Sequence, residues 1–154
     1  RYELVDIKDF NLELLDDPQV PGAANRQYVS PTTQAWSKKI DEFDGFVFVT
    51  AEYNHSVPAA FKNAVDLLAP EWADKAVGFV SYGADSGIRA VEHWRTIVAN
   101  LRMLDVRAQV PLSLFTEFGP DGVNPNERRE RELNTMFDQL EDATGMLIAR
   151  RAQQ

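Results

Sequence analysis

The sequence predicts an open α/β sheet of parallel strands with helices on both faces, and three observations support this prediction. The runs FVFVT and KAVGFVSYG have the near-continuous hydrophobicity of strands that are buried inside a parallel sheet. Segments with an apolar residue every three or four positions alternate with these runs. The connections are short, which favours parallel strands joined by right-handed crossovers.

The first strand is expected in YELVDI, from Tyr2 to Ile7, where apolar residues have strand-like spacing. Residues 11–31, NLELLDDPQVPGAANRQYVSP, are rich in proline and glycine and predict a long surface loop. Loops of this length are uncommon unless they have a function, so this one could also rim a site or a partner surface.

A helix is expected to begin at Ser30 and Pro31, because proline is tolerated at the first helical position. Trp36, Ile40 and Phe43 recur at helical spacing and give this helix one buried face, and Asp44-Gly45 is expected to end it. The strand FVFVT follows, and its apolar run predicts cover on both faces of the sheet.

The strand KAVGFVSYG leads into the helix DSGIRAVEHWRTIVANLRML, whose apolar stripe consists of Val91, Trp94, Val98 and Leu101. VRAQVPL is a weaker strand candidate, and Pro111 near its end suggests an edge strand. Asn124, Pro125 and Glu127 resemble a helix cap, a first-turn proline and a capping box. The inward stripe expected for this last helix is Leu133, Met136, Phe137, Leu140, Thr144, Leu147 and Ile148.

Charge and composition exclude several classes of protein. The net charge of −8 disfavours a nucleic-acid surface, and the absence of cysteine excludes disulfides, thiolate metal sites and cysteine nucleophiles. Redox chemistry would therefore need a bound cofactor. His55 and His93 lack paired metal-ligand spacing, so no metal is predicted. Because the opening RYELVDIKDF is no secretion signal and no apolar run reaches membrane length, we expect residues 1–154 to form a single cytoplasmic domain without a membrane partner.

Two polar loops, AEYNHS and SYGADSG, follow the two best strands. In open α/β sheets ligands bind beyond the carboxyl ends of the strands, so these loops predict a crevice. Tyr53 offers a ring face and a hydroxyl group, and Asn54 offers a donor and an acceptor, which would suit a flat, partly polar heterocycle. Gly83 and Gly87 allow the backbone to approach a ligand closely or to take positive φ.

Each of these residues also has a plain structural interpretation. The Tyr53-Asn54 pair could simply form a turn or cap a helix, and SYGADSG could simply reverse the direction of the chain, without either of them contacting a ligand. His55 is expected on the surface. His93 lies one position from a buried stripe and is expected to be structural. The tryptophans are expected in the core or at an interface rather than against a cofactor: Trp36, Trp72 and Trp94.

AEYNHSVPAAFKNAVDLL, followed by KAVGFVSYGADSGIRAVEHWRTIVANLRMLDV, resembles the NAD(P)H-dependent FMN reductase family, which includes quinone, azo-dye and chromate reductases. The resemblance runs from about Tyr2 to Val110. It is most specific in the two loops and the helices that follow them, and weak in the C-terminal helix. It implies a three-layer, flavodoxin-like fold.

The first loop of this family usually reads Pro-Glu-Tyr-Asn. Glu52, Tyr53 and Asn54 match that motif, while Ala51 replaces the proline. The resemblance implies that these three residues bind the cofactor, with the loop lying against the isoalloxazine ring of FMN.

The second loop also matches the family. Ser81, Tyr82, Gly83 and Gly87 correspond to the serine and glycines that contact the polar edge of the flavin, so the resemblance implies that they too bind the cofactor. Ala84 stands where a second glycine is common, which makes the backbone path there less certain.

One departure concerns the start of the sheet. The family begins with an apolar strand and a Gly-Ser-x-Arg loop that holds the FMN phosphate, and this sequence contains neither. A flavodoxin-like sheet has strand order 2-1-3-4-5, so Tyr2–Ile7 would be its second strand. We therefore expect the first strand and the phosphate loop to be missing from this sequence, through truncation or a genuine deletion.

The function implied by the resemblance is an FMN-dependent oxidoreductase. Hydride from NAD(P)H would pass to flavin N5 and then to a small-molecule acceptor such as a quinone, an azo compound or a flavin. No catalytic side chain is expected, and the resemblance implies a homodimer or homotetramer that uses SVPAAFKNAVDLL at its interface. The alternatives are a flavodoxin-type electron carrier and a non-catalytic binding or regulatory domain. A receiver domain is disfavoured because FVFVT ends in Thr50, not in aspartate.

Overall fold

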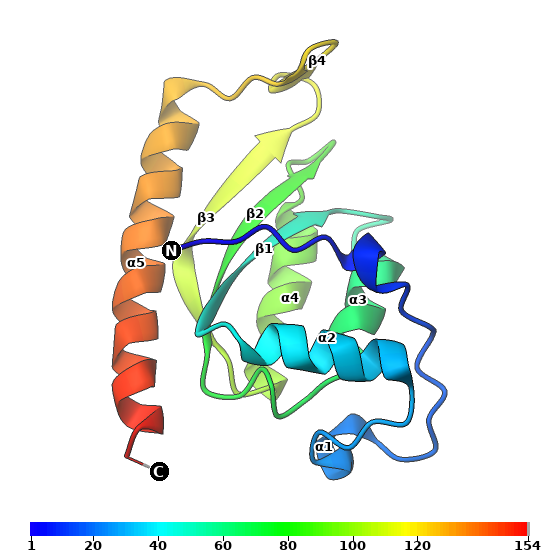
Figure 1. Cartoon of the computed structure of the whole chain (residues 1–154). Coiled ribbons are helices and arrows are strands. Elements are labelled where there is room, and N and C mark those ends of the chain that lie inside the picture. Colours follow the sequence, from blue (N-terminus) through cyan, green and yellow to red (C-terminus); the bar gives the residue numbers. More distant parts are fainter. Residues whose placement is uncertain (154) are drawn as a thin grey trace. The chain divides into compact units, whose positions relative to one another are not determined.

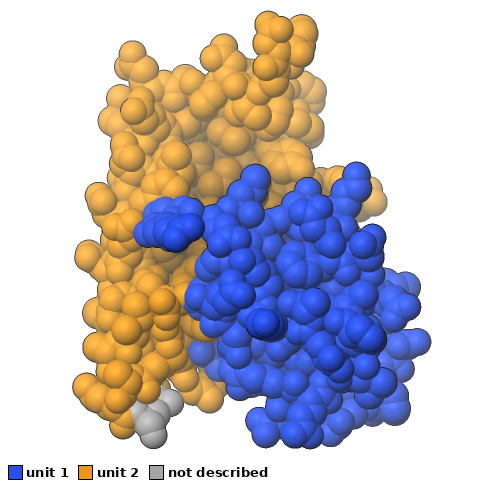
Figure 2. Space-filling model, viewed as in Figure 1, with its two compact units in different colours: residues 1–43, 59–73 blue, residues 44–58, 74–154 orange. Residues whose placement is uncertain are grey.

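The computed structural model describes residues 1–153, which form two compact units (Figure 2). Among the described residues, unit 1 consists of residues 1–43 and 59–73, and unit 2 of residues 44–58 and 74–153. Unit 2 carries the parallel sheet and both loops that were predicted from the sequence.

The sheet of unit 2 has three parallel strands in the order β1-β2-β3, namely β1 (Gly45–Ala51), β2 (Ala76–Gly83) and β3 (Leu104–Ser113). Their ends are in register, because Ala51 lies opposite Tyr82 and Gly83 lies opposite Ser113. The predicted strands FVFVT, KAVGFVSYG and VRAQVPL are confirmed, and Pro111 lies on an edge strand as expected.

Two helices cover opposite faces of this sheet (Figure 1): α4 (Ile88–Asn100) and α5 (Glu127–Arg151). On the α4 face, Trp94 is fully buried, packs edge-on against Phe48 and donates its indole N–H to Thr50 Oγ1 at 3.1 Å. On the α5 face, Met136 and Leu140 pack with Val106 and Val110 in one apolar cluster. The expected sheet with helices on both faces is therefore confirmed in unit 2.

Three details of these elements differ from the predictions. β1 is not covered on both faces, because the side chain of Val49 is 57% exposed. The cap of α5 is Asn126, whose side chain accepts a hydrogen bond from the N–H of Arg128, so the cap lies two residues beyond the predicted one at Asn124. Ile148 is exposed, and the inner stripe of α5 includes Ala143 instead.

The predicted first strand at residues 2–7 is wrong. The segment pairs with no strand among the described residues, and Leu4 is 91% exposed. Asp6 instead caps a short 3-10 helix, η1 (Ile7–Phe10), by accepting from the N–H of Lys8 at 2.9 Å. Apolar alternation predicts a strand only where a neighbouring strand can satisfy its backbone groups.

Unit 1 contains three α-helices besides η1: α1 (Pro21–Ala24), α2 (Pro31–Asp41) and α3 (Ala59–Asp66). The Ser30-Pro31 start of α2 is confirmed, but α2 ends at Asp41 rather than at Asp44-Gly45. Trp36 packs edge-on against Trp72 and donates its indole N–H to the carbonyl of Ala64 at 2.7 Å. The tryptophans are therefore core residues, as expected.

The predicted long loop is largely confirmed, since α1 is its one short helix and it lines a hollow of about 640 Å³ within unit 1. Tyr28 from this loop donates its hydroxyl group to the buried carboxylate of Glu71 at 2.9 Å, and Ser37 donates to the same carboxylate at 2.6 Å. Burial, together with the hydrogen bond to Glu71, raises the pKa of Tyr28. These contacts attach the loop to its own unit.

Candidate functional site

The candidate site lies where the three parallel strands of unit 2 end. The loops that follow β1, β2 and β3 are residues 52–58, 84–87 and 114–126, named here loop 1, loop 2 and loop 3. Because the strands are parallel and in register, their carboxyl ends meet at one edge of the sheet. Backbone bonds join the loops there: Glu52 N–H donates to the carbonyl of Tyr82, and Leu114 N–H to that of Gly83, both at 3.1 Å.

Loop 1 contains a two-residue hairpin. The backbones of Tyr53 and Ser56 exchange two hydrogen bonds of 3.0 Å, and the central residues Asn54 and His55 have φ values of 49° and 66°. Positive φ at both central positions is what a type I′ turn requires, and asparagine tolerates it well. The side chain of Tyr53 is 63% exposed at this turn, and Asn54 and His55 are exposed beside it.

Glu52 points its side chain inward, unlike Tyr53. Its side chain is 8% exposed, and the carboxylate accepts two hydrogen bonds from Arg89 in the first turn of α4, one from the guanidinium at 2.7 Å and one from the backbone N–H at 3.0 Å. The same guanidinium pairs with Asp85 of loop 2 at 2.8 Å. Hydrogen bonds to Glu52 and then Asp85 raise the pKa of Arg89.

A second contact attaches loop 1 to α4. Ser56 Oγ lies 2.9 Å from Nδ1 of His93. His93 follows Arg89 by four residues, so both side chains lie on the same face of the helix. The structural role expected for His93 agrees with this contact, and His55 is on the surface as expected.

Loop 2 is shaped by contacts within itself. Ser81 is fully buried and donates its hydroxyl group to the carbonyl of Ser86 at 2.8 Å. Gly87 has φ of 71°, and a Cβ atom there would lie 2.7 Å from the Cβ of Ser81. Gly83 packs against the backbone of Gly87 and the side chain of Glu52. The packing of the loop therefore requires glycine at position 87 and leaves little room for a side chain at Gly83.

The exposed part of loop 2 offers backbone donors. Ala84 and Asp85 are exposed. Among residues 1–153, the backbone N–H groups that donate to this turn of the chain are those of Ser86 and of Ile88 at the start of α4, and the N–H groups of Ala84 and Asp85 are not among them. The ring of Tyr82 lies 5.8 Å from that of Phe118, between loops 2 and 3. The edge of the sheet thus combines aromatic rings with N–H donors.

Loop 3 was not identified as part of a site from the sequence. It contains a short hairpin of β4 (Phe118–Gly119) and β5 (Gly122–Val123). Buried Glu117 holds the loop: its carboxylate accepts from Arg129 Nε at 2.7 Å and from the N–H of Ser113 at 2.9 Å. The bond from Arg129 lowers the pKa of Glu117. Phe115 is 80% exposed, and two apolar residues after the end of a strand, Leu114 and Phe115, are the sequence signal that could have identified this loop.

The structure brings all seven predicted site residues to one edge, but they differ in what they can offer a ligand. Tyr53 and Asn54 present their side chains to solvent, whereas the side-chain oxygens of Glu52 and Ser81 already bind protein groups. Of the remaining three, Tyr82 is partly exposed, whereas Gly83 and Gly87 are buried in the packing of the loop. Tyr53 and Asn54 are thus the two predicted residues whose functional groups face outward.

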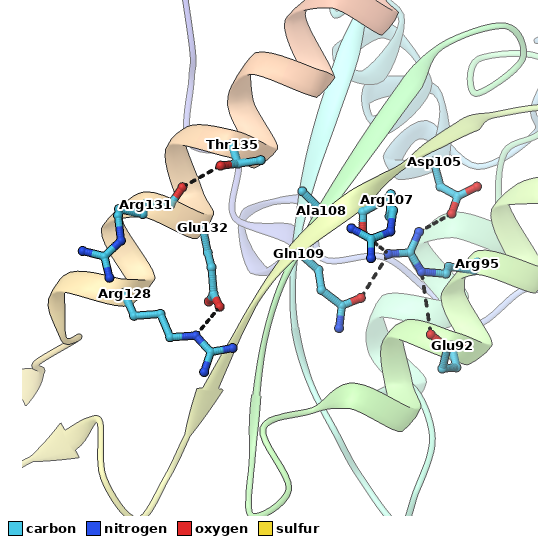
Figure 3. Close-up of a pocket in the computed structure, with 10 residues that line it drawn as sticks. All are labelled: Glu92, Arg95, Asp105, Arg107, Ala108, Gln109, Arg128, Arg131, Glu132 and Thr135. Carbon is cyan, nitrogen blue, oxygen red and sulfur yellow. Dashed lines mark hydrogen bonds and ion pairs between the residues drawn. The ribbon is translucent and has the colours of Figure 1, made fainter.

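A separate hollow of about 840 Å³ lies along the edge of β3, between α4 and α5 (Figure 3). Arg95 from α4 donates there to the carbonyls of Val106 at 2.9 Å and Arg107 at 3.2 Å. On the α5 side, Gln139 accepts from the N–H of Ala108 at 2.9 Å. Side chains thus satisfy backbone groups of this edge, which disfavours the addition of another strand. The hollow contains none of the seven predicted site residues.

None of the helices formed by residues 1–153 combines the length and apolar composition that crossing a membrane requires. Over the same residues, no group of three or more histidine, aspartate or glutamate side chains is arranged to hold a metal ion.

Comparison with known proteins identifies the family. The model of the family described as NADPH-dependent FMN reductase matches residues 1–117. The chain is 40% identical over 102 residues to an NAD(P)H-dependent FMN reductase of Schizosaccharomyces pombe, covering 66% of this chain and 51% of that protein. It is 34% identical over 115 residues to an NAD(P)H:quinone oxidoreductase of Solanum tuberosum, covering 70% of this chain and 59% of that protein.

A solved structure has the same fold. The flavoenzyme FerB, an NAD(P)H:(acceptor) oxidoreductase of Paracoccus denitrificans, superposes with a TM-score of 0.68 at 18% identity, covering 93% of this chain and 81% of that chain. The predicted flavodoxin-like fold is therefore confirmed.

This chain spans a little over half the length of the curated relatives described above. The family match, in contrast, covers most of this chain and includes loops 1 and 2 completely, together with Glu117 of loop 3. The chain belongs to the NADPH-dependent FMN reductase family.

Proposed function

We propose that the protein is an FMN-dependent oxidoreductase that transfers hydride from NAD(P)H, through bound FMN, to a small-molecule acceptor such as a quinone, an azo compound or a flavin. The observation that supports the proposal most directly is the Tyr53-Asn54 turn, which faces outward at the same sheet edge as loop 2. Membership of the family supports the choice of cofactor. Curated relatives named as quinone reductases or quinone oxidoreductases support the choice of acceptor class.

The residues at this edge fit the flavin ring of FMN. The isoalloxazine ring is flat and aromatic, with carbonyl and N–H groups along one edge. Tyr53 would supply a ring face, Asn54 an amide that both donates and accepts, and Ala84 and Asp85 backbone N–H donors. The buried side chains of Glu52 and Ser81 would hold these groups in place from behind.

FMN supplies the hydride chemistry when bound, and the side chains position and shield it. The three loops would hold the ring at the carboxyl edge of the sheet and limit the access of water to it. Phe115, exposed on loop 3, would add apolar surface beside the ring, where a nicotinamide or an aromatic acceptor could pack. No protein side chain is assigned a proton transfer.

An absorbance experiment tests this function. FMN is added to the purified chain, unbound flavin is removed, and NADPH or NADH is added without oxygen, followed by a quinone. We expect flavin bands that remain with the protein, bleach with the donor and return with the quinone. Free FMN at the same concentration is the control. Failure to retain FMN, or retained FMN that neither donor bleaches, would contradict the proposal, and the latter result would favour an electron carrier.

The assembly, location and domain organisation are also proposed. The resemblance supports a homodimer or homotetramer that uses α3, and a cytoplasmic location is the remaining expectation. A single domain of residues 1–154 is supported by the path of the chain, which passes between the two units after residues 43, 58 and 73. One cooperative unfolding transition in calorimetry is expected, and two separate transitions would contradict the single domain.

A further inference from the structure

We infer that Glu52 is a positioning residue rather than a ligand of the flavin, and that with Arg89 it fixes the Tyr53-Asn54 turn onto α4. The inference deepens the proposed function, because the turn is the part of the site that would present Tyr53 to FMN. It also assigns a role to Arg89, which the sequence did not indicate.

The turn cannot hold its own position. A single pair of backbone bonds between Tyr53 and Ser56 is its only ladder among the described residues, and short two-stranded hairpins are marginal in water. Both central residues have positive φ, and Tyr53 is largely exposed, so burial adds little to hold it. Something outside the turn must therefore restrict it.

Two side-chain contacts flank the turn and both end on α4. Before the turn, the carboxylate of Glu52 binds the side chain and the backbone N–H of Arg89. After it, Ser56 contacts His93 at 2.9 Å. Trp94, the residue next to His93, is fully buried under β1, so α4 is a rigid support for both contacts.

The geometry of Glu52 argues against direct contact with a ligand. Its side chain is 8% exposed, and both carboxylate oxygens accept hydrogen bonds from Arg89. A flavin carbonyl would need a hydrogen-bond donor, which a carboxylate lacks, and a flavin N–H would need an acceptor that Arg89 does not already occupy. Arg89 also pairs with Asp85 of loop 2, so this one guanidinium connects the two loops that would surround the ring.

The test compares Arg89→Met, Glu52→Gln and the double variant with the unchanged chain. Arg128→Met is the matched control, because Arg128 is an exposed arginine with its own glutamate partner at 2.8 Å on α5, outside the three loops. Amide hydrogen exchange of residues 52–57 is measured first, without FMN. We expect exchange about tenfold faster in both single variants, no further change in the double variant, and no change in the control.

The second measurement uses the fluorescence of bound FMN, which a stacked tyrosine quenches. Arg89→Met and Glu52→Gln are expected to bind FMN about tenfold more weakly and to quench it less, since Tyr53 is no longer held. Arg89→Lys should recover part of both effects, because an ammonium group can still meet the carboxylate.

Unchanged exchange at residues 52–57 in Arg89→Met would overturn the inference, and so would additive effects in the double variant. If a variant exchanges the amides of residues 52–57 faster but still quenches FMN fluorescence fully, the contact between Glu52 and Arg89 does not control the position of Tyr53. If the unchanged chain binds no FMN, the proposed function fails, while the exchange experiment still decides whether Glu52 and Arg89 hold the turn.

Discussion

Loop 1 and loop 3 are each held by a glutamate–arginine pair, and the two pairs differ in how deeply they are buried. In loop 3 the side chains of Glu117 and Arg129 are 2% and 15% exposed. In loop 1 the side chain of Glu52 is 8% exposed but that of Arg89 is 41% exposed. Solvent screens the second pair far more than the first.

This difference suggests different roles. Breaking a buried ion pair is costly, and Glu117 also accepts from the N–H of Ser113, so the loop 3 pair is expected to contribute strongly to the stability of the fold. The loop 1 pair is expected to contribute mainly to the position of Tyr53. The following predictions test that division, beginning with the largest effect.

Glu117→Ala is expected to reduce the free energy of unfolding by about 3 kcal/mol, because it leaves Arg129 with Glu132 as its remaining carboxylate partner and removes the acceptor of the Ser113 N–H. Denaturant unfolding measures the change. Asp138→Ala, which removes an exposed carboxylate from the middle of α5, is the control and should change stability by less than about 0.5 kcal/mol. Equal losses of stability in Glu117→Ala and Asp138→Ala would contradict the special contribution of the buried Glu117–Arg129 pair.

Gly87→Ala is expected to cost about 2 kcal/mol, because the new Cβ would lie 2.7 Å from Ser81 Cβ and 2.9 Å from Tyr82 N at a φ of 71°. Thermal unfolding measures the loss. Gly145→Ala is the matched control: no heavy atom lies within 4 Å of its Cβ position in α5, so it should stabilise the helix by roughly 0.5–1 kcal/mol. A neutral Gly87→Ala would mean that loop 2 is free to rearrange.

The buried pair also predicts a dependence on pH. The hydrogen bond from Arg129 lowers the pKa of Glu117 in the folded chain below that of the unfolded chain. Its stabilising effect is therefore complete above the unfolded pKa of about 4.3 and is lost as the pH falls through the folded value. Unfolding of the unchanged chain and of Glu117→Gln should differ most near neutral pH and converge in acid. A difference that stays constant with pH would contradict this account.

The smallest effect is expected for His55→Gly in loop 1. His55 is exposed and has φ of 66°, and Asn-Gly is the preferred pair for a type I′ turn. The variant should gain about 0.5 kcal/mol in stability and slow the amide exchange of the turn. A loss of stability would show that the imidazole of His55 has an interaction of its own.

Much of the fold could be predicted because the strands and helices that are buried are marked by their apolar side chains. β1 and β2 have apolar side chains at most positions, and α4 has a regular stripe, so each was recognisable by itself. Tyr2–Ile7 was predicted wrongly because its alternation says nothing about a partner strand. The start of α5 was misplaced by two residues because Asn124 and Asn126 are both good caps, and only the backbone at Asn126 chooses between them.

The candidate site was predictable only in part. Loops 1 and 2 could be found because each follows a recognisable strand. The pairing of Glu52 with Arg89 could not, because 37 residues separate them and the sequence does not encode their contact. Glu117 and Arg129 are similarly linked only by the path of loop 3. The side chain of Glu52 points inward while that of the next residue, Tyr53, points outward, and this difference depends on the conformation of the turn, which the sequence does not show.

The most direct test of the account is an FMN titration of the unchanged chain and of Tyr53→Ala, followed by flavin fluorescence. Met146→Ala, which removes an exposed apolar side chain from the far end of α5, is the control. The account predicts saturable, quenched binding by the unchanged chain and the control, and binding about tenfold weaker with reduced quenching in Tyr53→Ala. Equal affinity and quenching in all three proteins would contradict it, because the flavin would then bind elsewhere than at the Tyr53-Asn54 turn.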